Sequence, residues 1–453
     1  MVKLIRRSPR EAILAYQLLH SSRVRIALAL IVCAALYAPI FLREPAESDW
    51  ACCFVRAANR MLAGQAIHVV EDHPYAYPPL MALLTIPFTL ASPLVGLGCW
   101  YVVNIIAVGV LMDRSRRLVG IASWSHLQGR ELAAFAAALL LCGRFLVGPL
   151  ETRQFDLVVA AFLFAGLAWL QDGSTLRGAA SIGAAAAMKC TPLLFVPMLF
   201  LVGKRRAAAL VALVAVGLNF LPDVLTPRNS STYYLAEWKE TFLDVAHEVP
   251  PGTWFSGLLQ NQSVAGGWQR YFRYGLPTSN VALRHAKLAA VDLPQLRFAV
   301  YVTYGLLLSV AAAVLVRRPV ARLRESQPQR FAEEAALILS LMLLLSPMTS
   351  RAHYATVLLP VWLMMRRALV ERERSMKAIA VLLLICGPLI AKGIIGKQFG
   401  ELALAWSLPT WFAGVLFIAT AARLRLSCLG SESCVIPQAE SVDRNRGRCS
   451  VSL

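Results

Sequence analysis

Residues 79–112 read PLMALLTIPFTLASPLVGLGCWYVVNIIAVGVLM, a run without a single charged side chain. About 20 consecutive apolar residues are enough for a helix to cross the hydrocarbon core of a bilayer. The run is too long for one straight crossing and contains Pro87 and Pro93, so we expect a bend or an interfacial piece within it. A segment of this kind predicts a membrane protein.

The whole chain has the composition of a protein that crosses a membrane many times. Of its 453 residues 58% are apolar and only 16% are charged, and the mean hydropathy is +0.58. Soluble domains hold about half apolar and a quarter charged residues, and the apolar content also excludes a disordered chain. We therefore predict an all-α polytopic membrane protein with about twelve transmembrane helices. The apolar segments lie at 26–42, 79–112, 131–148, 156–171, 176–189, 191–203, 207–222, 296–316, 332–346, 354–368, 377–393 and 403–420.

The distribution of basic residues predicts the orientation of these helices. If the N-terminus is cytoplasmic, most of the 45 Lys and Arg residues fall on the inner side, as the positive-inside rule requires. The net charge of +19 then reports topology and not nucleic-acid binding. We expect both termini in the cytoplasm, no cleavable signal peptide and insertion in the plasma (inner) membrane. The predicted parts are a basic arm at 1–25, a transmembrane domain at 26–422 with outer loops 43–78 and 223–295, and a disordered tail at 423–453.

Polar residues suited to chemistry gather on the outer face, beginning with Asp49. Its carboxylate follows the first span, is flanked by Trp50, and precedes a helical stretch with Arg56 and Arg60. At the membrane surface such a carboxylate could act as a general base on a lipid-anchored substrate. The structural alternative is that Asp49, like Ser48, only caps the following helix.

Two further segments carry cations toward the same face. Lys189 stands at the break Lys189-Cys190-Thr191-Pro192 of a segment too short for two full spans. A lysine at this depth needs an anion, and a lipid-linked phosphate, Asp156 or a headgroup would each satisfy it. Arg351 and His353 lie in a short outer loop, where the histidine is either a titratable site group or structural.

The large outer loop contributes amides. Asn261-Gln262-Ser263 follows the aromatic pair Trp254-Phe255 and precedes Trp268-Gln269-Arg270. Amides beside aromatic faces are a common way of binding sugar rings, although aromatic belts also anchor spans. One acid, several cations and donor amides on one face suit transfer of a group from a phosphate leaving group.

Several short motifs, taken in order, resemble glycosyltransferase family 87, the polyprenol-phosphate-mannose-dependent α-mannosyltransferases of the GT-C superfamily. The matching residues are Asp49-Trp50, Ala57-Ala58, Leu62-Ala63-Gly64, Tyr77-Pro78-Pro79-Leu80, Gln154 with Asp156-Leu157, Gly178, Gly183, Lys189 with Thr191-Pro192-Leu193-Leu194, Asn261-Gln262-Ser263, and Ser346-Pro347 through His353-Tyr354. The sequence departs from the family pattern at Arg153, Ser350 and Ala352.

This resemblance implies a GT-C-like fold and an inverting, metal-independent transfer of a hexose, most often mannose, from a polyprenyl-phosphate donor to a lipid or glycan acceptor. It places Asp49 at the position of the catalytic base and Lys189, with His353, toward the donor phosphate. No cofactor is expected. The candidate substrate-binding residues are Lys189, His353, Arg351, Gln154, Arg153, Tyr77, Asn261, Gln262 and Ser263.

Two other classes of function stay open from the sequence alone. A secondary transporter or lipid flippase would place ionisable residues near the bilayer midplane and would show internal repeats. A membrane scaffold would need no chemistry on the outer face. Here the ionisable candidates fall at span ends and no repeat is evident, so we favour the glycosyltransferase.

Overall fold

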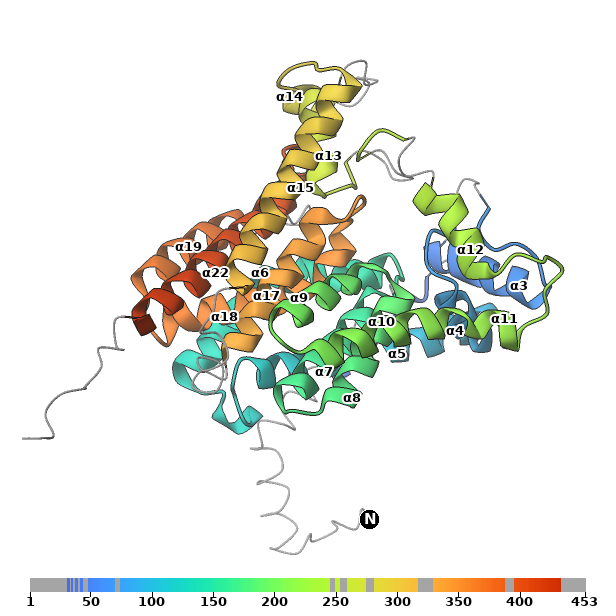
Figure 1. Cartoon of the computed structure of the whole chain (residues 1–453), viewed down its shortest axis with the longest axis horizontal. Helices are drawn as coiled ribbons and strands as arrows, with labels where there is room; N and C mark the ends of the chain where they lie inside the picture. Colours follow the sequence, from blue (N-terminus) through green and yellow to red (C-terminus); the bar gives the residue numbers. More distant parts are fainter. Residues whose placement is uncertain are drawn as a thin grey trace, which may run out of the picture.

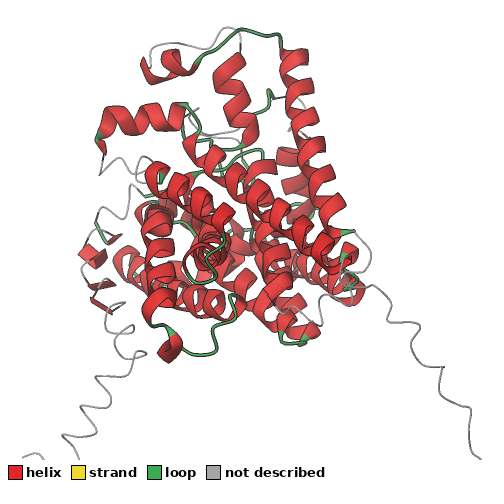
Figure 2. Cartoon of the chain, turned by 90° about the vertical axis from the view of Figure 1, so that its left-hand side faces the viewer, coloured by secondary structure: helices red, strands yellow, loops and turns green. Residues whose placement is uncertain are grey.

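The computed structural model describes residues 31–43 (apart from 33, 36 and 40), 48–69, 74–244, 249–252, 259–273, 281–316, 329–387 and 395–432. Over these ranges the fold is helical, and no strand forms apart from an isolated bridge between Arg273 and Val291 (Figure 1, Figure 2). The prediction of an all-α protein is confirmed. The predicted basic arm at 1–25 lies outside the described residues.

Short 3₁₀ or π turns, labelled η, alternate with α-helices along the described chain. In order, the elements are η2 (Trp50–Val55), α3 (Arg56–Leu62), α4 (Leu80–Thr89), α5 (Pro93–Leu118), η3 (Trp124–His126), α6 (Gly129–Glu151), α7 (Asp156–Gln171), α8 (Thr175–Met188), η4 (Thr191–Leu194), α9 (Phe195–Leu201), α10 (Arg205–Asn219), α11 (Leu221–Leu225), α12 (Tyr234–Trp238), η5 (Lys239–Asp244), α13 (Val264–Phe272), α14 (Val281–Ala286), α15 (Leu293–Leu315), α17 (Gln329–Leu345), η7 (Arg351–Val357), α18 (Leu358–Leu369), α19 (Arg374–Cys386), α21 (Lys397–Ala405) and α22 (Leu408–Glu432).

Several helices are apolar and long enough to cross a bilayer, so the chain is a multi-pass membrane protein. Among the described residues, four qualify by length and composition: α5, α6, α10 with α11, and α15. The pair α21 and α22, bent by 53°, would make a fifth crossing. The other predicted spans with described residues contain helices, but most of these are shorter; α7, for example, rises only about 24 Å against about 30 Å of hydrocarbon. The number twelve and the orientation of the termini therefore stay predictions.

Both predicted breaks in the apolar segments are confirmed. Helix α4 ends at Thr89, and α5 starts anew with Pro93 at its first turn, after Ser92 in an extended conformation. Helix α8 ends before Lys189, whose backbone is extended, and Pro192 opens the following 3₁₀ turn. Proline lacks the N–H that a continuing helix needs, which explains why the chain restarts at these places.

The C-terminal boundary requires a correction. We predicted a disordered tail from residue 423, but α22 continues to Glu432. The helix persists because Leu424 is fully buried and Arg423 pairs with Glu373 at 3.3 Å. Residues 433–453 lie outside the described part of the chain.

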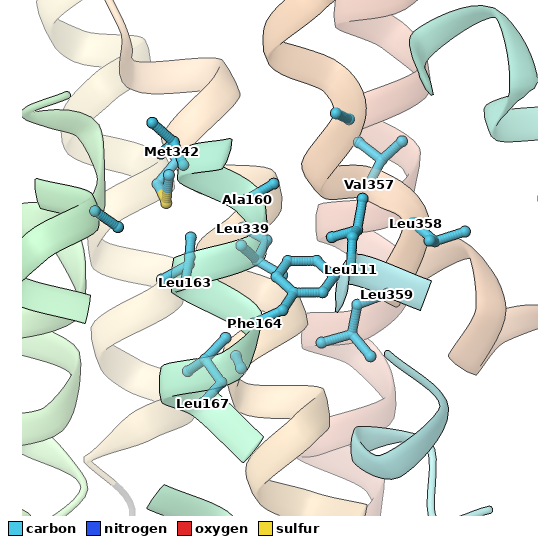
Figure 3. Packing of buried hydrophobic residues seen from close by; sticks show 14 of the residues in the cluster. Leu111, Ala160, Leu163, Phe164, Leu167, Leu339, Met342, Val357, Leu358 and Leu359 are labelled. Carbon is cyan, nitrogen blue, oxygen red and sulfur yellow. The ribbon is translucent and has the colours of Figure 1, made fainter. Parts of the chain in front are cut away.

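Helix α7 runs through the centre of the hydrophobic core. Figure 3 shows Leu163, Phe164 and Leu167 among side chains from α5, α17 and the η7–α18 segment. Its glycine also lets α8 approach closely, because a Cβ on Gly166 would lie 2.7 Å from the Gly178 carbonyl oxygen. Figure 1 shows α7, α8 and α10 side by side, and contacts between successive pairs agree. This packing fixes the start of α7 and the end of α8 relative to each other.

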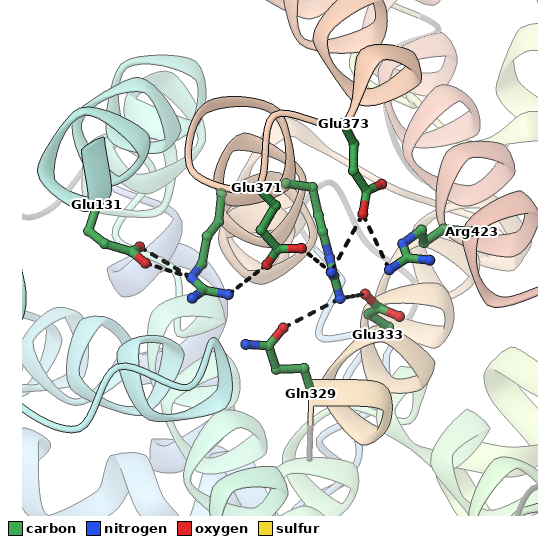
Figure 4. Close-up of polar contacts among 8 residues, drawn as sticks. Glu131, Gln329, Glu333, Glu371, Glu373 and Arg423 are labelled. Atoms are coloured by element: carbon green, nitrogen blue, oxygen red, sulfur yellow. Dashed lines mark hydrogen bonds and ion pairs between the residues drawn. The ribbon is translucent and has the colours of Figure 1, made fainter. Parts of the chain in front are cut away.

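A network of ion pairs joins the start of α17, the end of α18 and the C-terminal half of α22 (Figure 4). The Arg367 guanidinium contacts Glu333 at 2.5 Å and also binds Glu371. The Glu333 side chain is only 8% exposed, so its charge depends on this partner.

We expect Arg367→Met to lower the free energy of unfolding by about 1–3 kcal/mol, because it leaves the Glu333 carboxylate buried without its charged donor. Thermal unfolding of the purified protein in detergent measures the change. The control is Lys377→Met, which removes a charge from an exposed position of α19. Equal melting temperatures for both variants would contradict the prediction.

Candidate active site

Three titratable side chains meet where α7 begins and α8 ends. Asp156 is the first residue of α7, Lys189 follows the last residue of α8, and His353 lies in η7. The Lys189 ammonium donates to Asp156 Oδ1 at 2.6 Å, and His353 Nε2 lies 3.9 Å from the same oxygen. Within the described structure the buried Asp156 Oδ2 has no hydrogen-bond partner. The cluster therefore holds one acceptor whose bonding capacity is not used.

The Lys189 charge is stabilised in three ways despite its burial. Only 8% of the residue is exposed, and Asp156 provides the counter-charge. The ammonium also lies 5.7 Å from the ring centroids of Tyr77 and of Phe155, within the range of cation–π attraction. Of the anions that the sequence left open, Asp156 is thus the one that Lys189 contacts.

His353 is a neutral hydrogen-bond donor in this cluster. The Ser350 N–H donates to its Nδ1 at 3.3 Å, so the ring proton belongs on Nε2, which faces Asp156. Burial, followed by the positive charge of Lys189, lowers the pKa of His353 to about 4. At neutral pH the imidazole can therefore donate to an anion without carrying a charge.

The space beside these groups is small. A cavity of about 20 Å³ is lined by Asp156, Lys189 and His353 together with Thr191 and Ser346, and by further residues of α17 and η7. Roughly one water molecule fits such a volume. A sugar phosphate is too large for this cavity and could enter only if an existing contact opened. The contact that it would replace is the Lys189–Asp156 ion pair, because the phosphate and the Asp156 carboxylate are both anions that bind Lys189.

Asp49 does not act as a helix cap. It precedes η2, but its side chain makes no capping hydrogen bond. Ser48 takes that role, because its hydroxyl oxygen accepts the Ala51 N–H at 3.2 Å. The half-buried Asp49 carboxylate is thus available for another function.

Tyr77 lies between η2 and the Asp156 cluster. Its ring stacks on Phe54 at 5.3 Å and meets Phe155 edge-on at 4.8 Å. Burial raises the pKa of the Tyr77 hydroxyl well above its usual value, and the negative charges of Asp156 and, more weakly, Asp49 raise it further. The Tyr77 ring thus packs on Phe54 of η2, the turn that follows Asp49, and lies 5.7 Å from the Lys189 ammonium, so it separates these two parts of the predicted site.

His68 holds the Tyr77 segment against α12 of the large loop 223–295. Its side chain is fully buried, and Nε2 lies 3.0 Å from the Tyr77 carbonyl oxygen. The His68 backbone N–H donates to Glu237 at 3.1 Å, and Glu237 in turn binds Arg228 at 3.0 Å. Trp238 donates to the Ala76 carbonyl at 3.1 Å and adds a second link.

We expect acid to weaken this link. Burial lowers the pKa of His68 to about 4 from its ordinary 6.5, so between these values the unfolded chain binds the proton more readily. Stability should be fully present above pH 6.5 and should fall as the pH drops toward 4, by roughly 3 kcal/mol over the whole window. Melting temperatures from pH 7.5 to 4.5 measure the slope. Because the pKa of His353 is also lowered to about 4, His68→Gln should reduce the slope by about half. An unchanged slope in that variant would assign the effect to other groups.

Arg153 and Gln154 lie at the turn between α6 and α7 and serve different purposes. Arg153 has a left-handed backbone (φ 55°), and its guanidinium donates to the carbonyl oxygens of Phe41, at 2.8 Å, and Arg43. It therefore ties the first described segment to this turn. The Gln154 Oε1 is buried and has no partner among the described residues, so it remains a candidate for contact with substrate.

The charges that act most strongly on Arg351 belong to α6. Burial, and then the positive charge of Arg144, lowers the pKa of Arg351, while Glu151 acts in the opposite sense. Its Nη1 is buried and unpaired in the described structure. Arg351 is thus a separate cation on the same connection as His353.

Asn261, Gln262 and Ser263 are fully buried. The Asn261 amide donates to the carbonyls of Gly252 and Pro347 at 3.0 Å each, and the Gln262 amide donates to Leu404 at 3.0 Å. These bonds fasten the large loop 223–295 to the connection between α17 and α18, which carries His353. The arrangement favours a positioning role for the three residues over the direct contact with a sugar that we expected.

Asp156 and Phe155 belong to this cluster but were not among the residues that we expected there. Asp156 entered only as one possible partner of Lys189, although an ionisable residue at the start of an apolar helix is itself a signal. Phe155 offers no comparable signal, because an aromatic residue beside a span is most often packing.

Comparison with known proteins now identifies the family. The model of glycosyltransferase family 87 matches residues 75–347. The chain belongs to glycosyltransferase family 87. The match includes Tyr77, Asp156 and Lys189, whereas Asp49 and His353 lie just outside it.

Family 87 membership makes the protein a glycosyltransferase, and the apolar helices make it a membrane-embedded one. A search of curated proteins finds no match. Among solved structures, the crystal structure of ArnT from Cupriavidus metallidurans bound to undecaprenyl phosphate is similar over 90% of this chain and 79% of that one. The identity is 13% and the TM-score 0.36, so we transfer no residue from it.

Proposed function

We propose that this family 87 member transfers a hexose, with mannose as the first candidate, from a polyprenyl-phosphate donor to a lipid or glycan acceptor. The reaction would invert the anomeric carbon and take place at the outer face of the plasma (inner) membrane. The observation that supports this most is the packing of Tyr77. Its ring stacks on Phe54 of η2, the turn that follows Asp49, and lies 5.7 Å from the buried Lys189 ammonium.

The proposal gives each group one task. Asp49 removes the proton from the acceptor hydroxyl as its oxygen attacks the anomeric carbon. The bond from that carbon to the phosphate oxygen breaks, and the electron pair leaves with the phosphate. Lys189 and the Nε2–H of His353 stabilise the charge that develops there, so no metal ion is needed.

The donor phosphate would enter by competing with Asp156 for Lys189. Both are anions, and the donor brings an additional acceptor for His353. Because Asp156 is held at the start of α7, the exchange would move Lys189, whose extended backbone lies outside both neighbouring helices.

Purified protein in detergent, supplied with radiolabelled polyprenyl-phosphate mannose and a crude extract of membrane lipids, tests the proposal. We expect label to move to a new species, whose chemistry identifies the acceptor. Pentose donors are tested next if mannose is not accepted. Absence of transfer from every polyprenyl-phosphate sugar, together with proton- or sodium-driven uptake in proteoliposomes, would overturn it in favour of a transporter.

A further inference from the structure

A long apolar groove lies on the surface formed by α5, α7 and α8. Its volume is about 580 Å³, and its walls include Val103 and Ile106 of α5, Phe162 of α7 and Ala184 of α8. Ile106 is 61% and Phe162 43% exposed, so the groove opens outward to the surroundings of the protein. The volume is within the range of about 300–1,000 Å³ that is typical of ligand sites.

One end of this groove is basic. Arg114 and Arg177 line it there, with Trp169 between them along the chain. The Arg114 guanidinium lies over the Trp169 ring at 5.5 Å, which fixes its position at the mouth. Arg177 is exposed at the start of α8.

A single carboxylate, that of Asp113, is shared by Arg114 and two other arginines. Asp113 Oδ2 is 3.9 Å from Arg114 Nε, a distance too long for a hydrogen bond. Asp113 is bound more closely by Arg116 at 2.7 Å and by Arg117 at 3.3 Å. The buried Arg114 Nε accordingly has no hydrogen-bond partner among the described residues.

We infer that the groove binds an anionic glycerophospholipid of the surrounding bilayer. Its phosphate would lie between Arg114 and Arg177, and one acyl chain would follow the apolar wall toward Val103. The distance along α5 from Arg114 to Val103 is about 16 Å. This equals roughly one leaflet of a hydrocarbon core about 30 Å thick.

The charge pattern argues for a phospholipid and against the tail of the sugar donor. In the proposed reaction the donor phosphate lies at Lys189, beyond the opposite end of α8, and its apolar tail would need no cation at the far end of the groove. A headgroup phosphate uses both arginines and leaves the apolar wall to the acyl chain. Binding of an anionic lipid depends only on membrane insertion, whereas the choice of a phospholipid over the donor tail rests on the proposed function.

Native mass spectrometry of the detergent-solubilised protein with added phosphatidylglycerol or phosphatidylcholine tests the inference. We expect the wild type to retain phosphatidylglycerol preferentially. Arg114→Gln with Arg177→Gln should weaken its binding at least about tenfold, because two charge-assisted hydrogen bonds are lost. Arg205→Gln with Arg206→Gln is the matched control, since it removes the same charge from exposed positions of α10 outside the groove.

A second variant keeps the charges and fills the groove. Ala180 and Ala184 line it and are partly exposed, so phenylalanine at both positions should exclude the acyl chain without a clash in the core. Loss of bound phosphatidylglycerol in a variant that still elutes as a folded species supports the inference. Equal retention of both lipids by the wild type, equal loss in the α10 control, or displacement by polyprenyl phosphate alone would overturn it.

Discussion

Asp49→Asn is expected to insert and fold like the wild type and to transfer sugar about 10²–10⁴-fold more slowly. The amide keeps the shape of the side chain but cannot take a proton from the acceptor hydroxyl. Folding should be unaffected, because the capping bond of η2 comes from Ser48 and not from Asp49. Initial rates of label transfer under saturating donor and acceptor measure the effect.

The matched control is Asp172→Asn, which makes the same chemical change at an exposed turn between α7 and α8. It should leave the rate unchanged. A wild-type rate in Asp49→Asn would contradict the assignment of this residue as the base. The next candidate would then be the carboxylate of Asp156.

Lys189→Met is expected to have two separable effects. Removing the ammonium leaves the Asp156 carboxylate buried without its partner, which costs about 3–5 kcal/mol of stability in pairs of this kind. It also removes the cation for the donor phosphate, so the donor KM should rise more than the acceptor KM. Thermal unfolding and steady-state kinetics measure the two effects independently.

The double variant Lys189→Met with Asp156→Asn separates structure from chemistry. Neutralising Asp156 removes the uncompensated charge, so most of the lost stability should return. Transfer should stay low, because the donor phosphate still lacks its cation. Recovery of transfer together with stability, or an equal rise in both KM values, would show that Lys189 is structural.

Local sequence features predicted the parts of the fold that depend on local physics. Hydropathy alone indicated the helical membrane segments, and Pro93 and Pro192 indicated where the backbone would break. The family motifs followed from residue order alone, and the family assignment is confirmed. Hydropathy alone could not predict the number of crossings. Several apolar helices are shorter than the thickness of the hydrocarbon core, and their arrangement depends on how they pack.

The composition of the candidate site depended on contacts between distant segments. Residue types alone allowed Lys189 to face a phosphate, a headgroup or Asp156, a residue 33 positions away in the chain. From its residue type we expected Asn261 to contact a sugar. In the fold it is buried, and its amide donates to the carbonyl of Pro347, 86 positions away. Hydrogen-bond partners of this kind are selected by the global arrangement of helices, and no local pattern encodes them.

The sequence by itself therefore determined that this chain is a helical membrane protein of glycosyltransferase family 87, because apolar run length and motif order are properties of short segments. Only the tertiary structure decided that Ser48 caps η2, that Asp156 holds Lys189, and that Tyr77 packs against both Phe54 of η2 and Lys189. These outcomes needed three dimensions because a buried charge takes whichever partner the packed helices bring within about 3 Å.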